Sequence, residues 1–419
     1  MNPLAITKQF RFLHILTLVA TLVLAAPGIA QAWPATNRVP PMGWEPWNFD
    51  HCGTMYKWDE AYYEKLADFF VTSGLRDLGY TYLTIECHDH YRDQNGRIQP
   101  SAGTFPNGFK VVTAYIHSKG LKVRSYTDAG KAHCGRTFEG PGSFGHYEED
   151  AKQWRSFGFD GVKIDWCGGD QEGLDPETQY TQFADAIKAV LPDFSIEICS
   201  GGEGGPWTWG RSAGTFWRTE GDIDNTAKES DWPSTRGADW NSLLRNIDAN
   251  RHPSKKFVGP GKGWNYPDML EVGVPGGLDE MEERTQFSMW AVMAAPLFLG
   301  NDVFNMPAYA KEIIMNKEVI AVDQDPLGIQ GDVVKESGGG KIQVWSKKLE
   351  DGSRAVALLN RDSQAREMTV SCHDLGFLGK CHVRDLWLHA DKGSFASQYR
   401  VQVPSHGVVL LKISPVHGS

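Results

Sequence analysis

Short apolar runs alternate with amphipathic segments along most of the chain, from about residue 33 to residue 316. The runs have the length of buried strands, and apolar residues recur at helical spacing between them. In the segment 59–73, Leu66, Phe69 and Phe70 fall on roughly one helical face, and Gly74 ends the pattern. Eight runs are predicted strands, at 41–47, 82–86, 122–128, 161–166, 195–200, 215–222, 256–259 and 295–300. Eight strands alternating with helices predict a (β/α)₈ barrel at 33–322, and an open doubly wound sheet is the alternative.

The pattern changes after about residue 322. From Gly331 onward, Gly, Asp and Ser turns separate short stretches in which apolar and polar residues alternate. These stretches are 341–346, 354–359, 368–371, 382–386, 399–403 and 407–413. Alternation with a period of two is typical of strands with one buried face, so residues 323–419 are predicted to form a small antiparallel β-sandwich.

The first 32 residues have the features of an export signal. Lys8 and Arg11 precede an apolar run at about 12–26, and Ala30-Gln31-Ala32 provides small residues for cleavage after Ala32. The alternative is a membrane anchor, but the run is shorter than the roughly 20 residues that span a bilayer. We therefore expect a signal peptide at 1–32 and a mature protein that is secreted or periplasmic and not bound to a membrane.

Charge and composition narrow the range of partners. Removal of Lys8 and Arg11 with the signal peptide changes the net charge from 42 − 52 = −10 to 40 − 52 = −12. Because an acidic protein repels phosphate backbones, a nucleic-acid partner is not expected. The 15 tryptophans suit a carbohydrate site, since flat aromatic rings pack on the C–H faces of sugars, although tryptophan also builds cores.

Seven cysteines in an exported chain suggest disulfides with one thiol left over. Cys372 and Cys381 are close in sequence, and we expect them to form a local bridge in the C-terminal region. The residues alone do not fix the pairing of the other five, which are Cys52, Cys87, Cys134, Cys167 and Cys199.

The stretch 162–167 is predicted to be a buried strand that carries a carboxylate to its end. Side chains alternate along a strand, so Lys163 and Asp165 project to the same side. A neighbouring ammonium favours an ionised carboxylate, so Lys163 is expected to lower the pKa of Asp165, as a nucleophile requires. The alternative is a buried structural ion pair.

Other chemically functional residues also fall at the ends of predicted strands, where barrel enzymes place their active sites. In chain order these are Trp44, Trp47, Glu86, Tyr126, Asp128, Arg218, Glu220, Asp222 and Asp268. Hydrolysis of a glycosidic bond needs one ionised carboxyl group at the anomeric carbon and one protonated carboxyl group for the leaving group. A ring of carboxylates and aromatic residues suits this reaction, with a small carbohydrate or glycan as the substrate.

Several motifs together resemble glycoside hydrolase family 27, the family of α-galactosidases and α-N-acetylgalactosaminidases, in clan D. They are Met42-Gly43-Trp44 with Trp47-Asn48, Gly79-Tyr80, His117-Ser118-Lys119-Gly120-Leu121-Lys122, Tyr126-Thr127-Asp128-Ala129-Gly130, the stretch 162–167, Trp217-Arg218-Thr219 with Gly221-Asp222-Ile223, and Trp264-Asn265 with Pro267-Asp268-Met269-Leu270. The resemblance extends from about residue 40 into the predicted sandwich. It implies a (β/α)₈ barrel followed by a β-sandwich, retention of configuration, and neither a metal nor a cofactor.

The resemblance also implies roles for individual residues. Asp165 matches the nucleophile and Asp222 the general acid/base, whose carboxyl groups lie about 5–5.5 Å apart in a retaining enzyme. Glu220 is the alternative acid, two residues earlier on the same face. The substrate-binding candidates are Trp47, Glu86, Tyr126, Asp128, Lys163, Ser200 and Arg218.

Two further disulfides follow from the same resemblance. The family pattern pairs Cys52 with Cys87 and Cys134 with Cys167, and both bridges would brace strand ends near the site. Cys199 would then be the odd thiol.

The end of the second strand departs from the family pattern. The α-galactosidases have Asp-Asp-Cys-Trp there, and the paired acids hold the 4- and 6-hydroxyls of the sugar, whereas this chain has Ile85-Glu86-Cys87-His88-Asp89. One acid is missing and the other is the longer Glu86. This change could favour a sugar without a hydroxymethyl group, such as β-L-arabinopyranose. Alternatively, Asp89 supplies the missing acid.

The loop after the fifth strand also departs from the pattern. It is Cys199-Ser200-Gly201-Gly202-Glu203-Gly204-Gly205, where galactosidases have Cys-Glu-Trp and N-acetylgalactosaminidases have Cys-Ser. Small residues here could admit an N-acetyl group at the 2-position of the sugar, unless Glu203 or Trp207 covers the site. Tyr266 also stands where the family has Asp.

The sequence also offers alternatives to an exo-glycosidase. The sequence Cys87-His88-Asp89-His90 could suggest a metal site, but adjacent strand residues face opposite ways and a zinc site needs three or four converging ligands, so none is expected. A non-catalytic carbohydrate-binding barrel would be expected to lack an acid, and both Asp165 and Asp222 are present. A glucan hydrolase of the same family, acting internally or releasing disaccharides as an isomalto-dextranase does, requires an open cleft. The sequence does not predict the oligomeric state.

Overall fold

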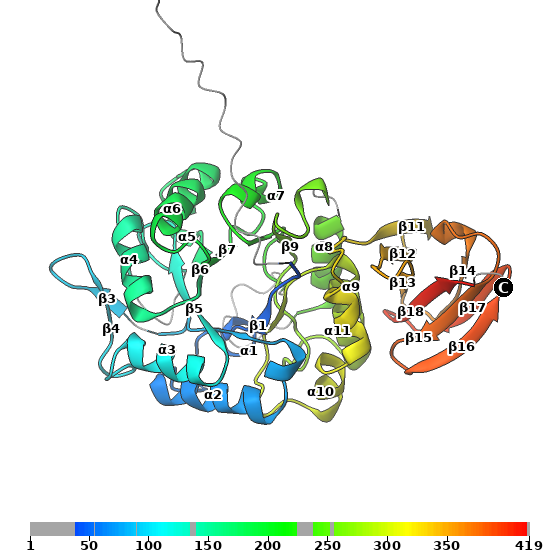
Figure 1. Cartoon of the computed structure of the whole chain (residues 1–419), viewed down its shortest axis with the longest axis horizontal. Coiled ribbons are helices and arrows are strands. Elements are labelled where there is room, and N and C mark those ends of the chain that lie inside the picture. The colour runs from blue at the N-terminus through cyan, green and yellow to red at the C-terminus, as the bar shows by residue number, and fades with distance from the viewer. Residues whose placement is uncertain are drawn as a thin grey trace, which may run out of the picture. The chain divides into compact units, whose positions relative to one another are not determined.

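The computed structural model describes residues 38–416 apart from 54, 89, 135–139, 224–237 and 252–254 (Figure 1). The predicted signal peptide at 1–32 and the alternative acid Asp89 lie outside the described residues. Within the described ranges, no helix has both the length and the apolar character needed to cross a membrane.

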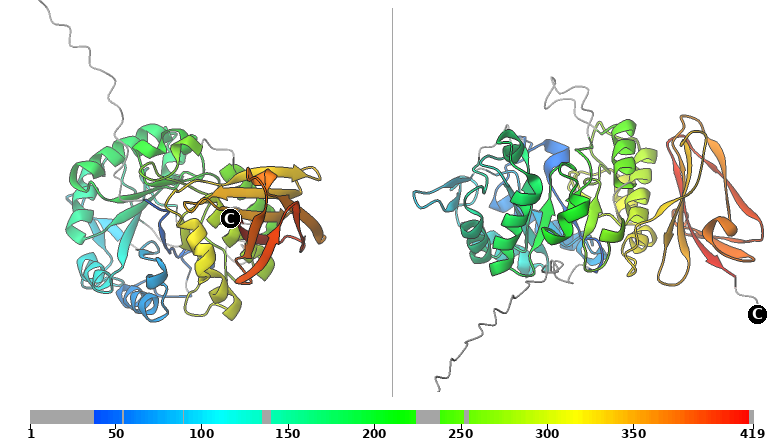
Figure 2. Two further views of the ribbon diagram at one scale, coloured as in Figure 1. Left: turned by 45° about the vertical axis from the view of Figure 1, so that its right-hand side comes forward. Right: turned by 90° about the horizontal axis from the view of Figure 1, so that it is seen from above.

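Eight parallel strands form one curled sheet in the first part of the chain (Figure 2). They are β1 (Met42–Trp44), β2 (Tyr82–Thr84), β5 (Lys122–Asp128), β6 (Gly161–Asp165), β7 (Ser195–Ile198), β8 (Phe216–Arg218), β9 (Trp264–Tyr266) and β10 (Leu297–Leu299). Their order is β10-β1-β2-β5-β6-β7-β8-β9, so the last strand pairs with the first. An isolated bridge between Leu270 and Leu299 links the segment after β9 to β10. The predicted barrel is confirmed, because an open doubly wound sheet would leave β1 and β10 apart.

The seventh strand lies later in the chain than predicted. The run 256–259 was expected to be a strand, but Lys255–Phe257 forms a 3₁₀ turn and the strand is β9. The chain turns between Gly259 and Gly263, both of which have positive φ angles that glycine adopts readily. This turn places Trp264, rather than the earlier run, opposite Phe216 in β8.

Helices surround the sheet and connect its strands (Figures 1 and 2). The longer ones are α2 (Glu60–Thr72), α3 (Phe109–Ser118), α4 (Tyr147–Phe157), α6 (Pro176–Val190), α8 (Trp240–Arg251), α9 (Glu280–Met293), α10 (Ala308–Ile314) and α11 (Lys317–Asp323). Side-chain caps fix several starts: Asp59 accepts the Tyr62 N–H at the start of α2, and Asp279 forms a capping box with Glu282 at the start of α9. The short helices α1 (Trp47–Asp50), α5 (Cys167–Gln171) and α7 (Pro206–Trp209) follow strands β1, β6 and β7.

The C-terminal part is an antiparallel sandwich, as predicted. One sheet has the order β11-β12-β13-β18-β15-β16, and β14 pairs with β17 in the other. The strands are β11 (Asp332–Ser337), β12 (Ile342–Lys348), β13 (Arg354–Asn360), β14 (Arg366–Ser371), β15 (Cys381–Asp385), β16 (Ala390–Phe395), β17 (Gln398–Val403) and β18 (Val408–Pro415). The edge strands β11 and β16 were not predicted, since most of their side chains are exposed and they lack a clear apolar face.

The helix α9 packs against both the barrel and the sandwich. Residues 285–293 of this helix are buried, and its neighbours include β13 and β18. The ammonium of Lys347, on β12, is buried and donates to the carbonyl oxygens of Ala291 and Val322 at 3.0 and 2.6 Å. These backbone acceptors satisfy a charge that would otherwise be costly to bury.

A two-stranded hairpin, β3 (His90–Arg92) with β4 (Ile98–Pro100), extends from the loop after β2 (Figure 1). Arg92 holds this hairpin to α4 through two bonds to the buried Asp150, at 2.7 and 2.8 Å. The hairpin was not predicted, because strands of three residues are too short to show an alternating pattern.

Candidate active site

A cavity of about 420 Å³ lies at the carboxyl ends of the barrel strands. The residues predicted from the sequence that line it are Trp47, Glu86, Tyr126, Lys163, Asp165, Ser200, Arg218 and Asp222. Its floor is closed by side chains that are at most 3% exposed, namely Glu86, Tyr126, Lys163 and Arg218. Among the described residues, these four side chains therefore close the inner end of the cavity.

Asp165 ends β6, and its carboxylate accepts a hydrogen bond on each oxygen. The Tyr126 hydroxyl donates to Oδ2 at 2.8 Å, and the backbone N–H of Trp166 donates to Oδ1 at 3.1 Å. Burial nevertheless raises the pKa of Asp165, and the charge of Lys163 and the Tyr126 hydrogen bond only oppose that rise. The expectation of a lowered pKa was wrong, because it left out the desolvation of a buried carboxylate.

Lys163 is bound to Glu86 instead of forming a pair with Asp165. Its ammonium donates to the two carboxylate oxygens of Glu86 at 3.0 and 3.3 Å and lies 4.0 Å from Glu45 Oε2. Burial raises the pKa of Glu86 to about 7, although Lys163 lowers it. The longer acid that replaces the family's aspartates thus reaches the lysine on the pocket floor.

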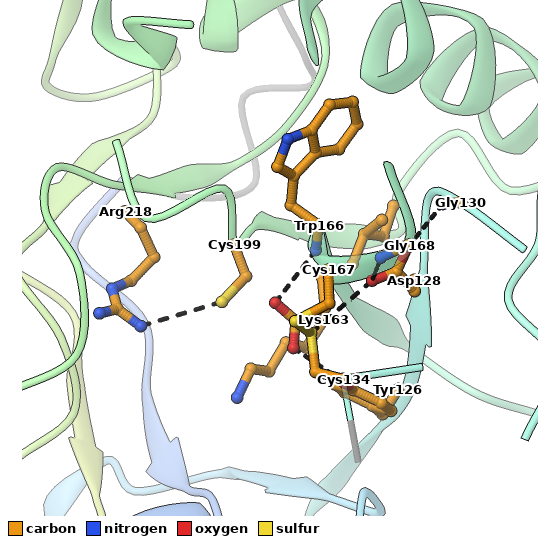
Figure 3. The surroundings of a disulfide bond; sticks show 12 residues. Tyr126, Asp128, Gly130, Cys134, Lys163, Trp166, Cys167, Gly168, Cys199 and Arg218 are labelled. Carbon is orange, nitrogen blue, oxygen red and sulfur yellow. Dashed lines mark hydrogen bonds between the residues drawn. A yellow bond between two sulfur atoms is a disulfide. The ribbon is translucent and has the colours of Figure 1, made fainter. Parts of the chain in front are cut away.

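Arg218 ends β8 and lies between two acids. Its Nη2 donates to Asp222 Oδ1 at 3.0 Å, and its Nη1 lies 3.0 Å from Asp268 Oδ1. Nη1 also donates to the Cys199 thiol sulfur at 3.8 Å (Figure 3). Burial raises the pKa of Asp268 to about 7, with Arg218 opposing the rise. The guanidinium therefore fixes the Asp222 side chain in the pocket wall.

Asp222 faces the pocket and Glu220 does not. The Asp222 side chain is 42% exposed and lines the cavity. Glu220 accepts the N–H of Gly221 at 3.0 Å, lies 4.0 Å from Arg245, and is not among the lining residues. Of the two acids weighed from the sequence, Asp222 shares a cavity with Asp165.

Asp128 does not line the pocket, contrary to its predicted role in substrate binding. It is fully buried, and its carboxylate accepts the backbone N–H groups of Gly130 at 2.6 Å and Gly168 at 3.1 Å (Figure 3). Strand alternation placed Asp128 on the same face as Tyr126. Asp128 is the last residue of β5, however, and its carboxylate is directed to the backbone of the segments that contain Gly130 and Gly168. Asp128 therefore ties the loop after β5 to α5.

Comparison with known proteins identifies the family. The family model for Alpha galactosidase A matches residues 39–325, and the model for the Alpha galactosidase C-terminal beta sandwich domain matches residues 339–413. The chain belongs to glycoside hydrolase family 27, the α-galactosidase family of clan D. This outcome confirms the resemblance stated from the sequence motifs.

Similar members of family 27 cover nearly the whole chain. Alpha-galactosidase A of Cellvibrio japonicus is 37% identical over 417 residues, which are 96% of this chain and 98% of that protein. The crystal structure of α-galactosidase I from Mortierella vinacea has a TM-score of 0.79 and 31% identity, over 91% of this chain and 98% of that one. The structure of the Saccharomyces cerevisiae α-galactosidase with raffinose has a TM-score of 0.81 and 26% identity, over 92% and 99% of the two chains.

This family 27 member has further pocket residues that the sequence-based analysis did not assign to the site. They are Cys134, Trp166, Cys167, Asp170, Cys199, Gly201, Gly221 and Met269. Each lies in a segment that follows a barrel strand, and this position is the only feature in the sequence that indicates a place near the pocket. Strand-end position alone does not tell which side chains in such a loop turn toward the pocket. Glu203, one of the two residues expected to cover the site if the loop is not open, also lines the pocket, and Trp207 does not.

Ser200 and Tyr266 occupy positions where the chain departs from its family. Ser200 lines the pocket, but its hydroxyl donates to the backbone carbonyl of Glu203 at 3.0 Å, so its proton is used within the loop. Tyr266 is fully buried in the barrel, where its ring packs edge-on against Phe216. Ser200 therefore contributes an oxygen and open space to the pocket, and Tyr266 is not part of its lining.

Three disulfides are present, with the pairings that the family and local spacing implied. Cys52 pairs with Cys87, Cys134 with Cys167 and Cys372 with Cys381, and Cys199 is a free buried thiol. The Cys134–Cys167 bridge lines the pocket wall (Figure 3).

Within the described residues, the grouping of potential metal ligands is Asp128 with Cys134 and Cys167. The two sulfurs are joined in a disulfide and offer no thiolate to a metal. Near the second strand, Cys87 is also in a disulfide, and the rings of His88 and His90 stack on each other.

A buried charge cluster lies beneath the pocket floor. Arg124 Nη1 donates to Glu45 Oε1 at 2.6 Å, and its Nη2 donates to Glu197. All three side chains are fully buried, and Glu45 also lies near Lys163. Burial raises the pKa of Glu197 to about 8. Through Glu45, the cluster lies next to Lys163 on the pocket floor.

Proposed function

We propose that this chain is a retaining, exo-acting α-galactosidase in which Asp165 is the nucleophile and Asp222 is the general acid/base. The observation that carries the proposal is that these two acids, one at the end of β6 and one in the segment after β8, line one pocket in a member of the α-galactosidase family. The closed floor supports action on a terminal sugar, since a chain running past the site would need an open cleft.

In the first step, Asp165 attacks the anomeric carbon while Asp222 gives its proton to the glycosidic oxygen. The leaving group departs as an alcohol, and an ester forms between the sugar and Asp165. The hydrogen bonds from Tyr126 and from the Trp166 backbone hold the attacking carboxylate in one orientation. The negative charge of Asp165 also favours the protonated form of Asp222 at this stage.

In the second step, Asp222 takes a proton from water, and the water oxygen attacks the anomeric carbon and breaks the ester to Asp165. Formation of the ester has removed the negative charge of Asp165, while the Arg218 guanidinium remains 3.0 Å from Asp222. That cation favours the ionised Asp222, which is the form that acts as the base. The two successive displacements return the α-anomer.

Turnover of p-nitrophenyl α-D-galactopyranoside tests this proposal. The wild-type protein is expected to hydrolyse it, and Asp165→Asn is expected to lower kcat by about 10³-fold or more, because the amide cannot act as the nucleophile. Asp185→Asn provides a matched control, since that carboxylate is on α6 and 68% exposed. Full activity of Asp165→Asn would contradict the assignment.

A second candidate substrate is a β-L-arabinopyranoside, and the observation that favours it is the Glu86–Lys163 contact on the pocket floor. A longer acid at this position takes space that a hydroxymethyl group would need. Parallel assays of the galactoside, the β-L-arabinopyranoside, the α-N-acetylgalactosaminide and the isomaltoside separate these possibilities. No turnover of any of the four would refute a glycosidase function.

We also propose that the protein is exported. The pattern at 1–32 and the three disulfides support this proposal, because disulfides persist in oxidising compartments. Expression of the full chain in a secreting host followed by N-terminal sequencing provides the test. A mature protein that begins at Trp33 is expected, whereas an uncleaved chain retained in the cytosol would contradict the proposal.

A further inference from the structure

Three buried imidazoles have no role in the proposed mechanism. His88 follows β2, His90 begins the hairpin strand β3, and His133 lies in the loop after β5. The rings of His88 and His90 stack with their centres 5.1 Å apart, and the centres of the His90 and His133 rings are 4.6 Å apart. All three residues are at most 9% exposed. We call them the histidine stack.

One end of the histidine stack contacts the Tyr126 ring. The His133 and Tyr126 rings are nearly perpendicular, at 82°, with their centres 5.0 Å apart. The Lys163 ammonium lies over the same tyrosine ring, 5.8 Å from its centre. Because the Tyr126 hydroxyl donates to the carboxylate of Asp165, the tilt of this ring decides where the donor lies. His133 therefore contacts the residue that hydrogen-bonds to the proposed nucleophile.

The other end of the histidine stack is fixed in the apolar core. The His88 ring packs nearly perpendicular to the rings of Phe105 and Phe109, at 79° and 87°. Its Nδ1 lies 3.0 Å from the carbonyl oxygen of Glu86. Buried side chains that are packed on several sides stay in one rotamer, so His88 has little freedom to move. It gives the His90 ring a firm support.

The loop that carries His133 is folded tightly against the hairpin. The His133 N–H donates to the carbonyl oxygen of Gly140 at 3.3 Å. A Cβ at Gly140 would lie 2.7 Å from the His133 ring and 3.0 Å from the His90 ring, so glycine is needed where both rings approach the loop. Arg92, on the hairpin, donates to the carbonyl oxygen of Gly142 at 2.8 Å. The hairpin therefore braces both the loop and the histidine stack.

The histidine stack is uncharged near neutral pH. Burial lowers the pKa of His90 to about 4, and it lowers the pKa values of His88 and His133 well below their usual range. Arg92, a cation that acts on His90 and His133 in the same direction, is bound to Asp150 at 2.7 and 2.8 Å. Replacement of a ring in the stack therefore changes the packing beside the pocket without removing a charge.

We infer that His133 is a positioning residue: its ring holds the Tyr126 ring at the angle from which the hydroxyl donates to Asp165. His88 and His90 support the His133 ring from behind. The inference rests on the proposed function and deepens it. Loss of the His133 ring would leave a cavity into which Tyr126 can tilt, and a hydrogen bond weakens steeply when its donor moves out of line. The ionised form of Asp165 would then be less favoured.

The first test is the acid limb of kcat/KM for p-nitrophenyl α-D-galactopyranoside against pH. His133→Ala should move this limb to a higher pH by roughly 0.5–1 pH unit, because a weakened hydrogen bond opposes the desolvation of Asp165 less strongly. His90→Ala acts through one more contact, so its shift should have the same direction and be smaller. His133→Phe keeps a flat ring at the contact and should restore the wild-type limb.

A double-mutant cycle shows whether His133 acts through Tyr126. In the Tyr126→Phe background, His133→Ala should add less than about 0.2 pH unit, because the hydroxyl that it positions is already absent. A general loss of packing would shift the limb equally in both backgrounds. These variants leave the other ionisable groups near Asp165 unaltered, which among the described residues are Glu86, Asp128, Lys163, Cys199 and Asp222.

Val383→Ala is the matched control for the loss of buried packing. Val383 is fully buried in the core of the sandwich, so its truncation should lower the melting temperature while the acid limb stays at the wild-type pH. All rates are measured below the lowest melting temperature of the set. If His133→Ala does not fold, the same cycle with His90→Ala decides the question.

The outcomes separate this inference from the proposed function. A wild-type acid limb in His133→Ala, an equal shift in the Tyr126→Phe background, or no shift in Tyr126→Phe itself would refute the positioning role, and the proposed function would stand. If the wild type hydrolyses no galactoside, the proposed function fails first.

Discussion

The Tyr126 hydroxyl donates a 2.8 Å hydrogen bond to Oδ2 of Asp165, across the neighbouring strands β5 and β6. Lys163, which the sequence placed beside Asp165, is instead bound to Glu86. The hydrogen bond from the neutral Tyr126 hydroxyl therefore favours the ionised form of Asp165, whose pKa is raised by burial. Removal of the Tyr126 hydroxyl should therefore change the pKa of Asp165.

Substitution of Tyr126 by Phe should move the acid limb of the pH–rate profile. The pKa of Asp165 is already raised by burial, and loss of a hydrogen-bond donor to the carboxylate raises this pKa further. As the pH is lowered, the variant should therefore lose activity at a higher pH than the wild type does. A hydrogen bond to a charged group contributes about 1.5–3 kcal/mol and one pKa unit is about 1.36 kcal/mol, so a shift of roughly one to two pH units is expected. The measurement is kcat/KM for an aryl galactoside against pH.

Tyr115→Phe is the matched control for this shift. The Tyr115 hydroxyl also donates to a carboxylate, that of Asp68, at 3.0 Å, but outside the pocket. Its acid limb should coincide with that of the wild type. An unchanged acid limb in Tyr126→Phe, or an equal shift in both variants, would show that the Tyr126 bond does not control the nucleophile.

Glu86→Asp should change the preference for the sugar. The shorter side chain withdraws from Lys163 by one methylene and leaves space on the pocket floor for a hydroxymethyl group. The ratio of kcat/KM for the α-D-galactoside to that for the β-L-arabinopyranoside is expected to rise about ten-fold, since one methylene in a pocket is worth ~1–3 kcal/mol.

Glu172→Asp makes the same shortening in a Glu–Lys pair outside the pocket, where Glu172 lies 3.3 Å from Lys131. Its substrate ratio should stay at the wild-type value. A fall in the ratio for Glu86→Asp, or no change, would mean that this acid does not set the space around the sugar's hydroxymethyl position.

Much of the fold and part of the site could be predicted from local sequence patterns. The stretch that ends at Asp165 was placed correctly as a buried strand, because a short apolar run with one strong polar end is a local signal. The seventh strand was misplaced, because the turn at Gly259–Gly263 moves the paired segment to Trp264 and only pairing with β8 fixes that register.

The electrostatics of the site could not be predicted from spacing. The partner of Lys163 is 77 residues away in the chain, and burial, which sets the direction of the pKa of Asp165, depends on the whole barrel. The same limit explains Asp128, whose carboxylate accepts a hydrogen bond from Gly168, 40 residues away in α5. Long-range contacts of this kind leave no local pattern in a single sequence.

The buried cluster beneath the pocket should make stability depend on pH. Burial beside Glu45 raises the pKa of Glu197 to about 8 from its ordinary 4.5, so the folded protein retains a proton that the unfolded chain loses. This contribution is fully present below about pH 4.5 and is lost as the pH rises toward 8.

Glu197→Gln removes that titration while keeping the shape of the side chain. Between pH 5 and pH 8, the free energy of unfolding of the variant should fall by roughly 1–3 kcal/mol less than that of the wild type, measured by urea denaturation. The exposed Glu148→Gln should follow the wild-type curve. Identical pH dependence in Glu197→Gln and wild type would exclude a proton on Glu197 in the folded state.

In the proposed mechanism, Asp165 forms a covalent bond to the anomeric carbon of the sugar. A galactosyl fluoride with fluorine in place of the 2-hydroxyl slows both displacements, so the sugar ester should accumulate on the nucleophile. The decisive measurement is mass spectrometry of the proteolysed, labelled protein. The adduct is expected on Asp165 and should be absent from the Asp165→Asn variant. An adduct on Asp222, Glu220 or Glu86, or no adduct in a protein that turns over galactosides, would show that Asp165 is not the nucleophile.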